Sequence, residues 1–281
     1  MSEPQQEIAV LIGQPVAGNP TQYMLEKAFA QAGLDWRYLT LEVPPDRLED
    51  AVRGFRVFGF RGANIAPPHK QAILSLVDEL SDSARRSDSV NCLHQTADRL
   101  RGENTLGIGL LRALRESLDP AGKQFVLLGA GATARACAVE LAQAKPAKIT
   151  LVNRTAERAR SIAEQLQHEF QIDAESVEWS GEFVVPIEAD ALIQATPLGS
   201  QDLPDRVPVD LSQSRTDLLV ADWVFNPVDT PLLQEAKASG RRTLDGLQLL
   251  VQQGAIAFQI WTGVQPDTVL MREALEEFLS V

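Results

Sequence analysis

One short glycine-rich segment restricts the fold of this 281-residue chain more than any other feature. It follows the apolar run QFVLL at 124–128 and precedes the amphipathic run ACAVELAQA. A strand, a tight turn and a helix in this order predict a dinucleotide-binding βα unit, in which a pyrophosphate lies at the helix N-terminus; an ordinary tight βα turn is the alternative. The segment fits the pattern G-x-G-x-x-A and consists of Gly129, Ala130, Gly131, Ala132, Thr133 and Ala134.

Each small residue of this turn has a physical purpose. Gly129 permits the tight turn, Gly131 lets the backbone approach the pyrophosphate, and Ala134 lets the helix pack closely on the strand. The first turn of the helix then offers free N–H groups and a partial positive charge to phosphate.

Short apolar runs alternate with amphipathic stretches, which is typical of βα repeats around parallel sheets. Before the turn we expect strands at 7–13, 36–42 and 58–65, helices at 21–32 and 46–53, and a hairpin from 89–94 and 99–103. Pro67 and Pro68 are expected to open a helix that extends to Val77. A domain boundary is expected near 105–122. Beyond it we expect strands at 148–153, 190–195 and 218–224, helices at 155–170, 246–262 and 266–280, and a surface loop at 200–216.

The composition excludes several classes of protein. A formal net charge of −12 argues against nucleic acid as a partner, because the chain would repel a phosphate backbone. No apolar run is long enough to span a membrane, and no secretory signal is expected. The two cysteines, Cys92 and Cys137, indicate a reducing compartment without a disulfide framework or a metal site. We therefore expect a cytoplasmic monomer or homodimer that binds a small-molecule substrate.

The end of the strand at 148–153 indicates which dinucleotide binds. This strand ends at Asn153 and is followed by Arg154 and Thr155, with Arg158 one turn later. An NAD site usually has a carboxylate at this tip for the ribose 2′-hydroxyl, whereas arginine pairs with the 2′-phosphate of NADP. The sequence therefore predicts NADP. Two solvated arginines would give the same pattern, since Glu157 lies beside Arg158.

Several motifs, taken in order, resemble the shikimate dehydrogenase family, which includes quinate/shikimate dehydrogenases. The likeness runs nearly end to end. It comprises the glycine turn, Ile12-Gly13-Gln14-Pro15, Gly62-Ala63-Asn64-Ile65, Ser89-Val90-Asn91, Gly102-Glu103-Asn104-Thr105, Asn153-Arg154-Thr155, Ala195-Thr196-Pro197-Leu198-Gly199, Asp245-Gly246-Leu247 and Gln253.

This resemblance implies an NADP-dependent enzyme that interconverts 3-dehydroshikimate and shikimate in aromatic amino acid biosynthesis. It also implies an α/β substrate domain at 1–105, joined by the C-terminal helices at 246–281, and a Rossmann-type doubly wound domain at 106–245. The cofactor would contact the glycine turn, residues 153–155, Arg158 and Thr196.

The family's catalytic pair is a lysine and an aspartate, and the chain keeps one of the two. Lys70 lies where the lysine belongs, eight residues after Gly62, and the resemblance implies that it handles the proton of the reacting hydroxyl. A solvated helix lysine is the alternative. The aspartate should follow Thr105, but Leu106 occupies that position. Leucine can neither accept a proton nor compensate the charge of the lysine.

Other polar positions of the family's substrate site also differ. The first loop of the family carries H-S-x-S-P, whose serines hold the substrate carboxylate, whereas the chain has Ala17-Gly18-Asn19-Pro20. Ala66 and Cys92 replace threonines, and Phe225 replaces a tyrosine. The candidate substrate-binding residues are therefore Asn19, Asn64, Asn91, Leu106, Phe225 and Gln253.

These departures leave two interpretations open. Each lost hydrogen bond costs about 1–3 kcal/mol, so shikimate would lose most of its usual affinity. Either the pocket takes a different, less polar hydroxyl or carbonyl compound, or the protein is a catalytically impaired NADP-binding sensor. Two residues are candidates to replace the aspartate: His69, otherwise an exposed histidine, and Glu103. A glutamyl-tRNA reductase type is a rival, which the acidic charge and the lack of a convincing nucleophile argue against.

Overall fold

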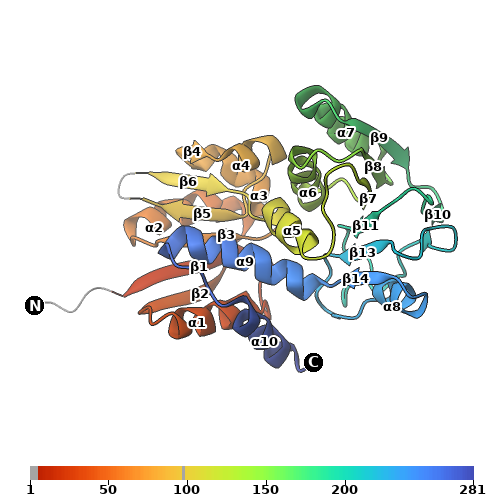
Figure 1. Cartoon of the computed structure of the whole chain (residues 1–281). Helices are drawn as coiled ribbons and strands as arrows, with labels where there is room; N and C mark the ends of the chain where they lie inside the picture. Colours follow the sequence, from red (N-terminus) through yellow and green to blue (C-terminus); the bar gives the residue numbers. More distant parts are fainter. Residues whose placement is uncertain (1–5, 97–98) are drawn as a thin grey trace, which may run out of the picture. The chain divides into compact units, whose positions relative to one another are not determined.

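The computed structural model describes residues 6–96 and 99–281, and the chain divides into two compact units (Figure 1). Unit 1 comprises Met1–Thr105 and Val251–Val281, and unit 2 comprises Leu106–Leu250. Each unit contains a six-stranded sheet with helices, which confirms the predicted α/β class. Across the described ranges, every helix is too short or too polar to cross a membrane.

The sheet of unit 1 is mixed, with strand order β2-β1-β3-β5-β6-β4. β1 pairs in parallel with β2 and β3, whereas β5 runs antiparallel to β3 and β6. The strands are β1 (Glu7–Gly13), β2 (Trp36–Glu42), β3 (Gly62–Ile65), β4 (Glu79–Leu80), β5 (Cys92–Gln95) and β6 (Leu100–Glu103). The helices are α1 (Thr21–Gln31), α2 (Leu48–Val57), α3 (His69–Ala72), α4 (Asp82–Ser87) and α10 (Thr268–Leu279), with 3-10 turns at Pro45–Arg47 and Ile73–Leu76. α9 (Gly246–Thr262) starts in unit 2 and belongs to unit 1 from Val251 onward.

The return of α9 to unit 1 depends on one missing side chain. A Cβ at position 62 would lie 2.3 Å from the Trp261 indole, so only glycine lets this ring lie against β3. The indole Nε1 donates a hydrogen bond to the carbonyl of Leu93 at 2.8 Å. Phe258 of the same helix stacks on Phe29 of α1 at a centroid distance of 5.1 Å. The C-terminal segment is thereby packed into the core of unit 1.

The sheet of unit 2 is wholly parallel and has the strand order β14-β13-β11-β7-β8-β9. Counted from β7, this is the order 3-2-1-4-5-6 of a Rossmann fold, read from the other edge. The strands are β7 (Gln124–Leu128), β8 (Lys148–Asn153), β9 (Asp173–Glu178), β11 (Ala191–Gln194), β13 (Leu219–Asp222) and β14 (Arg242–Leu244), with β10 (Phe183–Val184) and β12 (Val209–Asp210) in a separate pair. The helices are α5 (Leu106–Arg115), α6 (Ala132–Gln143), α7 (Ala156–Phe170) and α8 (Pro231–Ala238).

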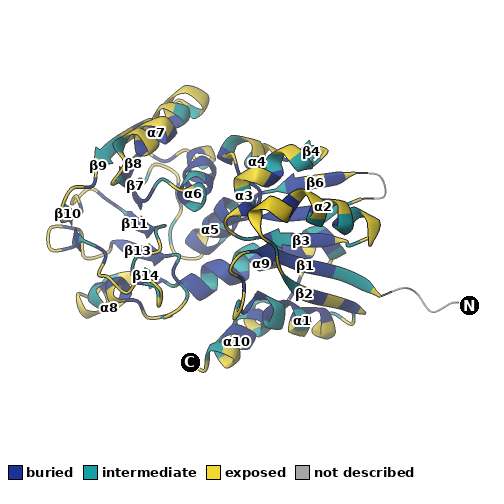
Figure 2. Cartoon of the chain, turned by 180° about the vertical axis from the view of Figure 1, so that it is seen from behind, coloured by how far each residue is buried: buried dark blue, intermediate teal, exposed yellow. Residues whose placement is uncertain are grey.

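Both faces of this parallel sheet are covered, which explains why β7 reads as a continuous apolar run. Phe125 and Leu127 pack into the core that contains residues of α5, α6 and α7. Val126 and Leu128 point to the opposite face and pack with residues of α8. Figure 2 shows the central strands buried, whereas α7 presents an exposed outer side.

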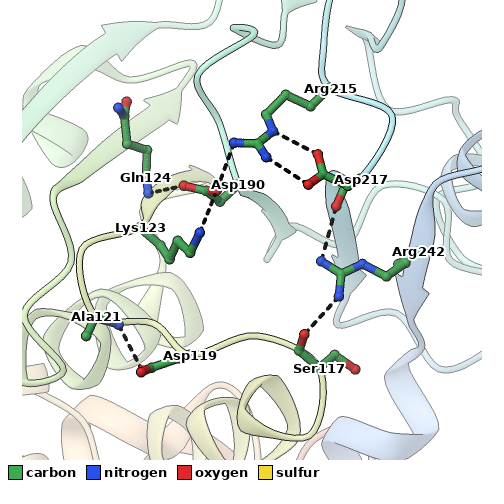
Figure 3. Close-up of polar contacts among 9 residues, drawn as sticks. All are labelled: Ser117, Asp119, Ala121, Lys123, Gln124, Asp190, Arg215, Asp217 and Arg242. Atoms are coloured by element: carbon green, nitrogen blue, oxygen red, sulfur yellow. Dashed lines mark hydrogen bonds and ion pairs between the residues drawn. The ribbon is translucent and has the colours of Figure 1, made fainter.

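The amino ends of these strands are closed by polar contacts (Figure 3). The carboxylate of Asp190 accepts from the Gln124 backbone N–H at 2.9 Å and lies 3.3 Å from both Lys123 Nζ and Arg215 Nη1. Arg215 also makes a two-pronged contact with Asp217 at 2.8 and 2.7 Å. This end of the sheet is therefore tied together by its own side chains.

The structure corrects some predicted elements. β3 begins at Gly62 rather than 58, because α2 continues to Val57. The α-helix predicted to reach Val77 ends at Ala72, and the chain continues as the 3-10 turn Ile73–Leu76. The predicted loop at 200–216 contains β12. Six further elements were not predicted from the sequence: α4, α8, β4, β9, β10 and β14.

Candidate functional site

The first part of the site is the glycine turn after β7, which lies at the topological switch point between β7 and β11. Gly129 has φ +110°, a conformation that residues with a side chain rarely adopt. A Cβ there would also lie 3.1 Å from Thr196 Cγ2 and 3.2 Å from the Ala195 carbonyl. Position 129 therefore requires glycine for its conformation, and the turn approaches the predicted cofactor residue Thr196.

The start of α6 is open in the way that a phosphate site requires. Gly131 is the N-cap residue, and no side chain caps the helix there. A Cβ at Gly131 would meet nothing within 4 Å, while Ala134 is fully buried against the sheet. The backbone N–H groups of the first turn, which no helical carbonyl can satisfy, are thus left for an anion. These residues fit the pyrophosphate of a dinucleotide.

The tip of β8 carries the predicted 2′-phosphate contacts. Asn153 ends the strand, and its Nδ2 donates to the Thr155 carbonyl at 2.9 Å. Arg154 and Arg158 are exposed, and within the described chain neither guanidinium has a hydrogen-bond or ion-pair partner. Glu157 does not pair with Arg158, so both guanidinium groups keep their donors for a ligand.

Two buried polar side chains at the carboxyl end of the sheet were missed by the sequence analysis. Gln194 ends β11 and Asp222 ends β13, and the two are register partners. Gln194 Oε1 accepts from the Thr196 N–H at 2.5 Å, and its Nε2 donates to the carbonyls of Thr196 at 3.0 Å and Leu198 at 2.9 Å. Gln194 therefore holds the loop that carries Thr196. A polar residue closing an apolar strand was the available signal.

Asp222 holds the loop that follows β13 and carries Phe225. Its Oδ1 accepts from the Val224 N–H at 2.9 Å, and its Oδ2 accepts from the Thr230 hydroxyl at 2.7 Å. Thr230 in turn caps α8 through the Leu233 N–H. Burial raises the pKa of Asp222 to about 6, because the hydrogen bonds do not fully replace water around the carboxylate.

In unit 1, hydrogen bonds bring the segments of Asn64, Lys70 and Asn91 together and join Asn91 to Gln253. The Asn91 carbonyl accepts from the Ile65 N–H at 2.8 Å, next to Asn64, and the Val90 N–H reaches the Lys70 carbonyl at 2.8 Å. Asn91 Nδ2 donates to Gln253 Oε1 at 3.3 Å. Lys70, Asn64 and Gln253 are partly exposed, whereas Asn91 is buried.

Two candidate partners of Lys70 have other contacts. His69 is buried rather than exposed, and its Nε2 lies 2.7 Å from the Val43 carbonyl. Glu103 pairs with Arg101 at 2.7 Å. In this structure, therefore, neither residue serves as the partner that would replace the family's aspartate.

The replaced positions are apolar or already bonded. Leu106 is buried at the start of α5 in unit 2, and Phe225 is partly buried in the same unit. Cys92 is fully buried, and burial raises the pKa of its thiol. Asn19 Oδ1 accepts from the Thr21 N–H at 3.0 Å. Among the residues that the structure describes, His, Cys, Asp and Glu side chains nowhere gather in a group that would hold a metal ion.

Three family models match the chain. They are the shikimate dehydrogenase substrate binding domain over residues 11–93, the shikimate/quinate 5-dehydrogenase model over 112–200, and the shikimate 5'-dehydrogenase C-terminal domain over 246–276. The NADP(+) shikimate dehydrogenase of Methanopyrus kandleri is 41% identical over 274 residues, which cover 96% of this chain and 94% of the relative.

Two solved structures show the range of relatives. The ligand-free 5-ketofructose reductase of a Gluconobacter strain has a TM-score of 0.94 and 41% identity, and covers 98% of this chain and 99% of its own. The shikimate 5-dehydrogenase of Thermus thermophilus, in complex with NADP(H) and shikimate, has a TM-score of 0.85 and 34% identity, and covers 97% of this chain and 100% of its own.

Proposed function

The chain belongs to the shikimate dehydrogenase family, and from this premise we propose that it reduces a small uncharged carbonyl compound other than 3-dehydroshikimate, or oxidises the corresponding alcohol. The predictions of this family, of an oxidoreductase and of NADP as its cofactor are confirmed by the comparisons. The substrate and the role of each residue are our proposal.

The cofactor side of the family's site is intact. The turn at 129–134 and the open start of α6 would hold the pyrophosphate, and Arg154 with Arg158 would hold the 2′-phosphate. Thr196, in the loop held by Gln194, would contact the nicotinamide half. The cofactor held there would supply the hydride that reduces the substrate carbonyl.

Lys70 would handle the proton. An ammonium beside the reacting oxygen stabilises the developing alkoxide and can give it a proton. Leu106 stands where the family has an acceptor for that proton, so the lysine would exchange its proton with solvent, to which it is partly exposed. Asn64 and Gln253 would orient the substrate beside it.

The single observation that carries this proposal is where the chain differs from the family: the substitutions fall in the substrate site and not in the cofactor site. The serines that hold a carboxylate in the family are replaced by Ala17-Gly18-Asn19, and the aspartate by Leu106, while the cofactor residues remain. A site without its carboxylate-binding hydroxyls favours a substrate without a carboxylate. The similarity to a 5-ketofructose reductase supports this, since an uncharged keto-sugar has no carboxylate to bind.

The test is steady-state NADPH oxidation with a panel of carbonyl compounds, which includes 5-ketofructose and 3-dehydroshikimate. We expect turnover of an uncharged carbonyl compound and little turnover of 3-dehydroshikimate. An NADP-binding sensor is the second candidate, because Leu106 removes half of the catalytic pair. NADPH binding without turnover of any compound in the panel would contradict the enzyme and favour the sensor.

A further inference from the structure

The amide of Asn64, one of the predicted substrate residues, is held by a single group of the protein. Its Oδ1 accepts from the Tyr38 hydroxyl at 2.7 Å. Within the described ranges this amide has no other hydrogen-bond partner. The register partners of Asn64 on the neighbouring strands are Leu11 and Cys92, whose side chains offer the amide no hydrogen bond. The orientation of the amide therefore depends on one phenol.

The sheet of unit 1 carries this phenol to Asn64 past two small residues. Tyr38 of β2 is the register partner of Ala9 in β1, and Ala9 is the register partner of Gly62 in β3. Side chains in one row of a parallel sheet share a face, and Asn64 lies two residues after Gly62 on that same face. Because position 9 carries only a methyl group, the Tyr38 ring can reach across β1 to the Asn64 amide.

The surroundings of Tyr38 fix its hydroxyl as a donor. Tyr38 is fully buried, and the centroid of the Trp261 ring lies 6.3 Å from its own. That indole fills the space over Gly62 and is held by its 2.8 Å hydrogen bond to the Leu93 carbonyl. Burial raises the pKa of the Tyr38 phenol, so the hydroxyl keeps its proton. A buried hydroxyl needs an acceptor, and this one is directed at Asn64.

Asn64 differs from the neighbouring Asn91 in how much of its amide is left for a ligand. Asn91 is buried, and its amide is bonded to Thr105 at 2.6 and 2.9 Å and to Gln253 at 3.3 Å. Asn64 is partly exposed, and its Nδ2, which has no partner in the described part of the chain, is open to solvent. Tyr38 therefore determines where this open end of the Asn64 amide points.

We infer that Tyr38 is a positioning residue, whose buried hydroxyl holds the Asn64 amide in the orientation that contacts the substrate. This inference rests on the proposed function for the substrate and adds a residue that acts on it only through Asn64. Without the hydroxyl the amide would rotate more freely, and binding would have to order it. Substrate affinity would fall, whereas the chemical step on bound substrate would keep its rate.

The experiment removes the hydroxyl with and without its partner. Tyr38→Phe leaves the ring in place. Tyr23→Phe is the matched control, because Tyr23 is the other of the two tyrosines and lies in α1 of the same unit. Both substitutions are made in the parent and in Asn64→Ala. The probe is the panel compound with the highest kcat/KM, or 5-ketofructose if no compound is turned over. The readouts are KM and kcat for NADPH oxidation, and the Kd of the probe for the NADP⁺-loaded protein by calorimetry.

We expect Tyr38→Phe to raise KM and Kd about three- to tenfold, the factor that one ordinary hydrogen bond corresponds to. Its kcat should stay within about twofold, because the lost contribution is the same for bound substrate and transition state. Tyr23→Phe should change none of these values. In the Asn64→Ala background Tyr38→Phe should alter neither KM nor Kd further, since the amide through which it acts is gone.

A second measurement needs no substitution at position 38. Because the chain has two tyrosines, labelling with fluorotyrosine gives two fluorine NMR signals, and Tyr23→Phe identifies the signal of Tyr38. Saturation of the NADP⁺-loaded protein with the probe should shift the Tyr38 signal and leave that of Tyr23 in place. The shift should disappear in Asn64→Ala.

An unchanged KM in Tyr38→Phe, or an equal change in the Asn64→Ala background, would overturn the inference and leave the proposed function intact. Binding of the probe with the expected pattern but without turnover would contradict the proposed function and support the inference. If the parent neither binds nor reduces any compound of the panel, both are wrong. Thermal melting checks that the variants fold, and if Tyr38→Phe does not fold, the fluorine signals decide the question.

Discussion

The two units use their polar side chains in different ways. In unit 2, Gln194 and Asp222 hold backbone loops, and the proposed cofactor site consists of a glycine turn, open N–H groups and two exposed arginines. In unit 1, the Asn91 amide is bonded to Thr105 and to the Gln253 side chain. Under our proposal, a dinucleotide would be recognised mainly by backbone geometry, whereas the substrate would be recognised by individual side chains. Substitutions can change the second without disturbing the first.

The strongest test of this separation is Lys70→Met. We expect turnover of the true substrate to fall at least about 100-fold, the typical contribution of a positioned acid or base, because methionine cannot donate a proton. The Kd of NADP should stay unchanged, since Lys70 belongs to unit 1. Steady-state kinetics with a parallel NADP titration measure both. Full activity of Lys70→Met would mean that the lysine is only structural.

Arg154→Ala tests the cofactor side alone. We expect the parent to bind NADP at least about tenfold more tightly than NAD, or about 1.4 kcal/mol, because an exposed guanidinium pairs with the 2′-phosphate. The variant should lose this difference by weakening NADP and not NAD. Titration of both dinucleotides into both proteins measures it. Equal affinities in the parent protein would contradict the assignment of Arg154.

Asp222→Asn tests whether the loop after β13 carries a buried titrating group. The pKa of Asp222 is raised from 3.8 to about 6 by burial, so the folded state holds this proton more tightly than the unfolded state. The stabilisation that comes from this tighter proton binding is fully present in the free energy of unfolding below about pH 4 and is lost as pH rises to about 6. Linkage at 1.36 kcal/mol per unit makes this loss about 3 kcal/mol.

Urea unfolding of the parent and of Asp222→Asn at several pH values measures this effect. We expect the variant to lack the loss between pH 4 and pH 6. Asp217→Asn is a control of opposite sign and smaller size, because Arg215 lowers the pKa of that exposed carboxyl. Identical pH profiles of the parent and Asp222→Asn would contradict a raised pKa.

Local sequence signals were sufficient for many elements of both units. The turn at 129–134 and the strands β7, β8, β11 and β13 were predicted because apolar runs and glycine are local features. The contact between the Val90 N–H and the Lys70 carbonyl beside α3 could not be predicted, since it joins distant segments. The burial of His69 against the Val43 carbonyl is equally non-local.

Contacts between distant segments also limit what can be predicted of the site. Position 106 could be compared with the family from the sequence alone, but the orientation of the Asn19, Asn64 and Asn91 amides could not be predicted. That orientation depends on Thr21, Tyr38 and Thr105, whose donors meet the amide oxygens only in the folded chain. Gln194 and Asp222 were overlooked although each closes an apolar strand, because a single polar residue at that place does not indicate which groups it binds.

The central claim is that the cofactor side of the family's site is intact while the substrate side has changed. The most direct measurement is kcat/KM for shikimate oxidation with saturating NADP⁺, compared with that for reduction of an uncharged carbonyl compound with NADPH. We predict slow or undetectable shikimate oxidation with a high KM, and clear turnover of the uncharged carbonyl compound. A kcat/KM for shikimate of about 10⁴ M⁻¹s⁻¹ or more, within the ordinary range of good enzymes, would contradict the account.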